Sequence, residues 1–132
     1  NFKEIRNMIK GFSREKNLKL AIYSAELVLH IFEEKYPQDD RPRKAIEAAK
    51  KCIESDTEEN RDVAYYYAAA GAASYAAASY AAASYAAAAA GTKAADYAAA
   101  AGTKAADYAA AAGGAKTKQK ILDYAIKLSE EK

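Results

Sequence analysis

Cysteine and histidine are almost absent from this chain of 132 residues. The scarcity of cysteine bears on disulfides and the scarcity of histidine on metal sites. With a single cysteine, Cys52, no disulfide can form within the chain, which fits a reducing compartment and predicts a cytoplasmic protein. A single histidine, His30, leaves no Cys/His cluster and no Glu-x-x-His pair with the spacing of a metal site. We therefore expect neither a metal nor a cofactor.

An excess of one charge is also missing. The 20 basic and 18 acidic residues leave a formal net charge of +2, so no overall positive field attracts nucleic acid. Lys116, Lys118 and Lys120 form a short basic cluster, which is typical of the solvated start of a helix rather than of a basic stripe that binds nucleic acid. No basic segment followed by an apolar segment opens the chain, so no signal peptide is expected.

A strongly hydrophobic run is absent too, although an uncharged one is present. The segment from Val63 to Thr92 is long enough to span a bilayer, but it lacks the Leu, Ile and Phe residues that drive membrane insertion. It consists mostly of Ala, Ser and Tyr. This composition predicts a buried helix in a bundle and no membrane partner.

Tandem repeats fill this segment. Ala-Ser-Tyr-Ala-Ala recurs every five residues, at Tyr75, Tyr80 and Tyr85, and an eleven-residue unit follows that contains Tyr97 and Tyr108. A five-residue step turns the side chain by about 140° around a helix, whereas an eleven-residue step returns to within about 20° of its start. Tyr97 and Tyr108 should therefore share one face. We expect both rings to be wedged into the core between closely packed alanines.

Proline occurs only twice, and β-branched residues are few and do not alternate. Ala, Lys and Glu, which dominate, are good helix formers. We predict an all-α fold, a single-domain antiparallel helical bundle with closely packed Ala-rich helices. The domain would comprise non-repetitive helices over 1–56, repeat helices over 57–113 and a C-terminal helix over 114–132.

Caps and helix breakers predict the element boundaries in the first half. A short helix is expected over 1–10. The next helix carries an apolar stripe spaced by three and four residues and ends before Pro37. The stripe consists of Leu18, Ile22, Ala25, Leu29, Phe32 and Tyr36. Asp39 and Asp40 offer a carboxylate cap for a third helix, which tolerates Pro42 in its first turn.

Ser55 and Glu58 have the spacing of a capping box that would begin a fourth helix. Glycines then punctuate the repeats. Gly71, Gly91 and Gly102 are expected to kink or break the helices, and the pair Gly113-Gly114 is the strongest stop. A final helix follows, and its inward-facing residues are Ile121, Leu122, Ala125 and Leu128.

No arrangement of residues points to catalysis. His30 and Cys52 belong to neighbouring predicted helices, but nothing supplies a third orienting group or an oxyanion site. The Gly-Thr-Lys triplets at 91–93 and 102–104 lack the preceding glycine and strand of a phosphate-binding loop. The charged residues from Asp39 to Arg43 are expected to cap and brace the third helix.

One segment carries a family signature. Residues 27–49 contain a helix that ends in Phe-Glu, a turn, and the sequence Asp-Arg-Pro-Arg-Lys-Ala-Ile-Glu-Ala-Ala. This segment resembles the Imm5-like family, whose members resemble the immunity proteins of bacterial polymorphic toxin systems. The closing segment from Lys120 to Leu128 is also similar to that family. The resemblance implies a small helical protein that binds and blocks a toxin without catalysis.

We therefore expect a non-enzymatic protein-binding module, an immunity protein that neutralises a cognate bacterial toxin. The alternatives are a structural or self-assembling protein that packs through Tyr/Ala faces and, third, an enzyme without a recognisable site. The expected partner is a protein, either a toxin or a second copy, and not nucleic acid. Consecutive tyrosines point in three directions, so at least one ring should be exposed. The candidate partner-binding residues are Tyr65, Tyr66, Tyr67, Arg41 and Arg43.

Overall fold

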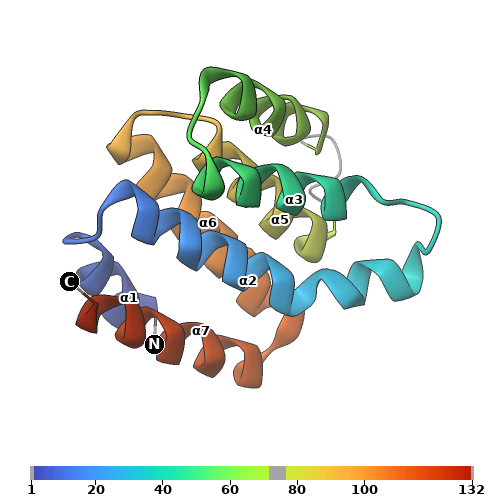
Figure 1. Cartoon of the computed structure of the whole chain (residues 1–132). Helices are drawn as coiled ribbons and strands as arrows, with labels where there is room; N and C mark the ends of the chain where they lie inside the picture. Colours follow the sequence, from blue (N-terminus) through green and yellow to red (C-terminus); the bar gives the residue numbers. More distant parts are fainter. Residues whose placement is uncertain (1, 72–76, 132) are drawn as a thin grey trace.

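The chain is described here by a computed structural model that covers residues 2–71 and 77–131 (Figure 1). Within these residues it forms seven helices and no strand, which confirms the all-α prediction. The repeat tyrosine Tyr75 lies outside the described residues. The helices are α1 (Phe2–Ile9), α2 (Arg14–Lys35), α3 (Arg41–Glu54), α4 (Glu58–Gly71), α5 (Ala78–Ala90), α6 (Ala95–Gly113) and α7 (Ala115–Glu130).

The alanine-rich α5 is the central helix of the bundle. It packs against α2, α3, α4 and α6, and almost all of its residues are buried. A helix that is apolar on every side is stable only where neighbours cover every side. The methyl side chains of α5 allow these four helices to approach it closely. Among the residues described, no helix combines the length and the hydropathy needed to cross a bilayer.

Glycines let α4 lie directly on α5. A Cβ atom on Gly91, just after α5, would lie only 2.9 Å from the backbone nitrogen of Tyr65 in α4. A Cβ atom on Gly71, at the end of α4, would collide with the Ser84 side chain of α5. Gly71 ends α4 and Gly91 follows α5, as the sequence predicts.

Gly102 does not break its helix, so the predicted break at this residue is wrong. α6 continues from Ala95 to Gly113 without interruption. A Cβ atom on Gly102 would lie 3.2 Å from the backbone oxygen of Asn17, so this glycine brings α6 close to α2. Packing against α2 offsets the cost of a helical glycine, which is about 1 kcal/mol relative to alanine. The stop at the end of α6 is confirmed, since Gly114 has a φ of +80°.

α2 begins at a cap that the sequence analysis did not name, and the cap of α4 differs from the predicted one. Ser13 caps α2, because its Oγ accepts a hydrogen bond of 3.2 Å from the backbone N–H of Lys16. The capping box at Ser55 is wrong. Ser55 instead ends α3 by donating its N–H to the carbonyl of Lys51, and Thr57 begins α4 by accepting from the N–H of Asn60 at 3.1 Å.

The repeat tyrosines occupy different environments. Tyr97 is 53% exposed, so its predicted core position is wrong. Tyr108 is half-buried, and its ring stacks on Tyr85 with the centroids 5.5 Å apart. Tyr97 and Tyr108 lie on similar sides of α6. Tyr85 of α5, however, packs on Tyr108, which lies nearer the C-terminal end of α6. Tyr80, in contrast, is only 1% exposed.

Candidate functional site

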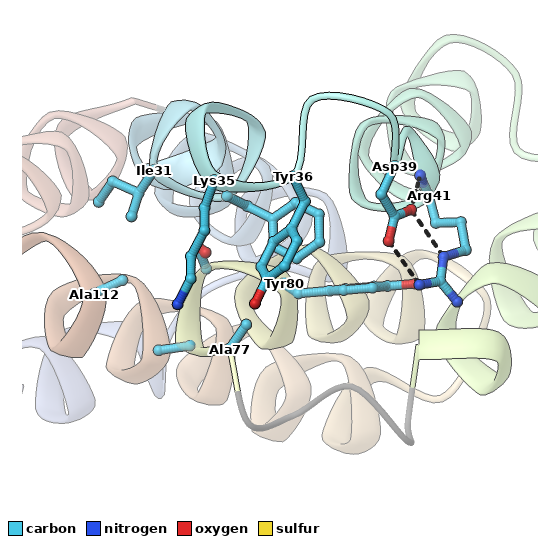
Figure 2. Close-up of a pocket in the computed structure, with 11 residues that line it drawn as sticks. Ile31, Lys35, Tyr36, Asp39, Arg41, Ala77, Tyr80 and Ala112 are labelled. Atoms are coloured by element: carbon cyan, nitrogen blue, oxygen red, sulfur yellow. Dashed lines mark hydrogen bonds and ion pairs between the residues drawn. The ribbon is translucent and has the colours of Figure 1, made fainter.

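A cavity lies at the corner between α2 and α3, above the start of α5 (Figure 2). α2 ends at Lys35 because Pro37 follows, and the chain turns into α3 at Arg41. The cavity has a volume of about 670 Å³. Figure 2 shows the rings of Tyr36 and Tyr80 on its walls, with Lys35 and Arg41 on either side.

Tyr80 ties three helices together at this corner. Its ring meets Phe32 of α2 edge to face, with the centroids 5.2 Å apart. The guanidinium carbon of Arg41, at the start of α3, lies 5.4 Å from the centroid of the same ring. Burial raises the pKa of the Tyr80 hydroxyl, so this group stays neutral at ordinary pH. The corner is thus a fixed junction of α2, α3 and α5.

Arg41 is held by Asp39. Its Nε and Nη2 atoms donate to the two carboxylate oxygens of Asp39 at 2.8 and 2.6 Å, and its backbone N–H donates to Oδ1 at 3.1 Å. The hydrogen bonds from the Arg41 side chain lower the pKa of Asp39. Asp40 makes no side-chain capping hydrogen bond and pairs with Lys44 at 3.6 Å. Asp39 rather than Asp40 therefore supplies the carboxylate that caps α3.

Arg43 is held in the same way by Glu33 of α2. Its Nε and Nη2 atoms donate to the Glu33 carboxylate at 2.7 and 2.6 Å, which lowers the pKa of Glu33. Bidentate pairs of this kind fix the orientation of both side chains. The structure thus brings both predicted arginines to the corner, where they brace α3. Their contact with a partner stays a prediction.

The three predicted tyrosines lie on α4, which packs against α3 and α5 and leaves its other side open (Figure 1). Tyr65 and Tyr66 are 63% and 66% exposed, which confirms that at least one of these rings faces outward. Tyr67 is half-buried, and its ring meets that of Tyr66 edge to face at 5.4 Å.

Acidic residues share the open side of α4 with these tyrosines. Residues spaced by four, three and four lie in one row along a helix. Two such rows of exposed residues run side by side, and together we call them the outer face of α4. The first row is Glu58, Asp62, Tyr65 and Ala69, and the second is Glu59, Val63, Tyr66 and Ala70. The first row runs from two carboxylates to a tyrosine. The second row runs from one carboxylate and Val63 to a tyrosine.

The basic residue of α4 does not reach this face. Arg61 is only 9% exposed, and its Nη1 atom donates to Oδ1 of Asp56 at 2.7 Å. Arg14 of α2 joins the same group, since it donates to Asp56 at 3.2 Å and to the carbonyls of Ala90 and Thr92 at 2.9 and 2.6 Å. This network anchors the start of α4 to α2 and to the end of α5.

Sequence reasoning missed the acidic half of the outer face. The available signal was the spacing of Glu58, Glu59 and Asp62 relative to Tyr65 and Tyr66, which becomes visible once the helix is known to begin at Glu58. The Arg14 network left no comparable signal in the sequence, because Arg14 is 42 residues away from Asp56 and 76 residues away from Ala90.

His30 and Cys52, the pair considered for catalysis, lie in different environments. His30 is exposed on α2, whereas Cys52 is buried in α3, and burial raises the pKa of its thiol. In the part of the chain that the structure describes, no group of three or more potential ligands could hold a metal ion.

A comparison with known protein families shows to which family the chain belongs. The family model of the Imm-5 like putative immunity protein matches residues 7–131, from α1 to α7. The chain belongs to this family. The Imm-5 like match includes the corner at Asp39–Arg43 and the whole of α4. No curated protein and no solved structure shows significant similarity to the chain.

Proposed function

We propose that this protein is a non-enzymatic, cytoplasmic immunity protein that binds a bacterial toxin and blocks it. Family membership supports a protein partner. The observation that carries the proposal is the pair Tyr65 and Tyr66, which are 63% and 66% exposed side by side on one helix. Tyrosine is enriched in protein interfaces because its ring buries apolar area while its hydroxyl stays hydrogen-bonded.

The scaffold behind these tyrosines suits them to binding. α4 approaches α5 closely at Gly91, and Arg61 holds the start of α4 by its hydrogen bond to Asp56. Arg14 links Asp56 in turn to the carbonyl of Ala90 at the end of α5. A surface that is already ordered loses little conformational entropy when it binds. Tyr67 supports the ring of Tyr66 from the side. We therefore propose Tyr65, Tyr66 and Tyr67 as contact residues, with Arg41 and Arg43 at the edge of the interface.

Co-expression tests the proposal. The probes are the proteins encoded by the genes next to that of this chain, each produced in bacteria with and without the chain, and the toxin is the one that arrests growth. We expect the chain to restore growth and to form a stable complex with the toxin in gel filtration. Growth arrest in its presence, together with no complex, contradicts the proposal. Restored growth without a complex, with the toxin chemically altered, favours an enzyme instead.

Self-assembly is the second candidate, and the exposed tyrosines are also the observation that favours it. The alanine faces of α5 are covered within one chain, whereas Tyr65, Tyr66 and Tyr97 are exposed and available for contacts between copies. Sedimentation velocity over a range of concentrations separates the two functions. We expect a monomer throughout, whereas a mass that grows with concentration supports self-assembly.

A further inference from the structure

We propose that the outer face of α4 docks an arginine-rich surface of the partner protein. This inference rests on the proposed function and adds the chemistry of the partner. It is carried by the side-by-side arrangement of carboxylates and tyrosines on a single exposed helix face.

Among the residues that the structure describes, the carboxylates of this face have no positively charged partner. Glu58, Glu59 and Asp62 are exposed, and none of the three forms an ion pair with any residue that the structure describes. The cation of their own helix, Arg61, is turned inward to Asp56. A protein with a net charge of +2 thus carries a locally negative surface at this position.

Helix stability accounts for only part of this charge. Glu58 and Glu59 lie in the first turn, where carboxylates stabilise the positive end of the helix dipole. Asp62 lies in the second turn, where that effect has largely decayed. Val63, Tyr65 and Tyr66 are exposed beside it at 48%, 63% and 66%, so the face is apolar as well as acidic.

Arginine is the side chain that fits both features at once. Asp62 precedes Tyr65 by three residues and Tyr66 by four, and side chains at these spacings are neighbours on a helix. One guanidinium group can therefore stack on a tyrosine ring while it donates hydrogen bonds to the carboxylate beside it. Lysine provides the charge but not the planar, stacking donor group.

A second copy of this chain is a poor occupant. α4 offers no outward-facing cation, so two outer faces packed together would bury carboxylates without counter-charges. Burying an unpaired charge is strongly unfavourable. A basic partner, in contrast, neutralises the face as it covers it.

Charge reversal tests the inference on the full-length chain. The probe is the toxin that this chain neutralises on co-expression, and binding is followed by surface plasmon resonance. The variant carries Glu59→Lys and Asp62→Lys. We expect its association rate to fall roughly 10- to 1000-fold, because electrostatic steering toward the face is lost. Circular dichroism of the variant checks that the helical fold is retained.

The matched control carries Glu34→Lys on α2 and Glu130→Lys on α7. Both glutamates are exposed, and the control changes the net charge by the same amount away from α4. We expect it to bind the toxin at nearly the wild-type rate. Equal losses in the two variants would show a general charge effect and would overturn the inference.

Salt dependence provides a second measurement that needs no variant. We expect the association rate of the wild-type chain to fall steeply as sodium chloride is raised. A rate that is independent of salt would overturn the inference while the proposed function stands. If the wild-type chain does not bind the toxin at all, the proposed function fails, and the inference fails with it.

Discussion

At the scale of single residues, the carboxylate of Asp39 holds the start of α3. It accepts from the backbone N–H of Arg41 and from the Nε and Nη2 atoms of the Arg41 guanidinium group. The neighbouring Asp40 makes one longer contact, to Lys44. The sequence placed a carboxylate cap here but left two aspartates equivalent, because only the geometry of the turn decides which of them faces the first N–H group.

Asp39→Ala should therefore destabilise the protein, while Asp40→Ala serves as the matched control. Loss of a helix cap lowers the free energy of unfolding by about 0.5–2 kcal/mol. We expect a loss in this range for Asp39→Ala and a smaller one for Asp40→Ala, measured by urea denaturation. The reverse order would show that Asp40 is the cap in solution.

The paired carboxylates of Asp39 and Glu33 predict how the stability of the protein depends on pH. Their arginine partners lower the folded-state pKa of Asp39 and of Glu33 below the unfolded values of about 4. A lowered folded pKa adds stability above the unfolded pKa, and this stability is lost as the pH falls through the folded pKa. We expect stability to fall progressively below about pH 4. The double variant Asp39→Asn, Glu33→Gln should lose less stability over that interval, and an unchanged profile would contradict the pairing.

At the scale of elements, propensity decided some boundaries and tertiary packing decided others. Pro37 and the pair Gly113-Gly114 end helices through backbone geometry alone, so sequence reasoning placed both ends correctly. Gly102 has the same local signal as Gly91 but lies inside α6, because α2 packs tightly against it. Tyr97 and Tyr108 have the same surroundings in the repeat sequence. The sequence does not show that a neighbouring helix covers α6 at Tyr108 and leaves it open at Tyr97.

The two glycines give a matched pair of variants. A Cβ on Gly91 would meet the Tyr65 backbone nitrogen at 2.9 Å, and one on Gly102 would meet the Asn17 oxygen at 3.2 Å. Gly91→Ala should lower the free energy of unfolding by about 1–3 kcal/mol, because a backbone atom must move. Gly102→Ala should lower it less, since the gain in helix propensity of about 1 kcal/mol offsets the crowding. Thermal melts of both variants check this order, and a larger loss for Gly102→Ala would contradict it.

At the scale of the whole molecule, the part of the repeats that forms α5 supplies the centre of the core. α5 is covered by four helices, and most of its alanines are buried. The sequence predicted a buried Ala-rich helix from its composition. It did not predict that this helix would be the centre of the bundle, because the order in which helices surround one another depends on long-range packing.

A small-to-large change tests this central position. Ala86 in α5 is fully buried, whereas Ala100 in α6 is exposed. Ala86→Leu should lower the free energy of unfolding by about 1–3 kcal/mol or more through overpacking, and Ala100→Leu should have little effect. Chemical denaturation of both variants checks the difference. Equal stability would show that α5 is less tightly enclosed.

The arrangement leaves α4 as the exposed helix that carries the predicted tyrosines, and binding through it is most directly tested by calorimetry. The toxin that this chain neutralises on co-expression is titrated with the wild type, with the double variant Tyr65→Ser, Tyr66→Ser, and with the control Tyr97→Ser, a residue 53% exposed on α6. We expect the double variant to lose at least about 2 kcal/mol of binding free energy, as interface tyrosines at hot spots do. The Tyr97→Ser control should bind like the wild type. Full affinity in the folded double variant would contradict binding through α4.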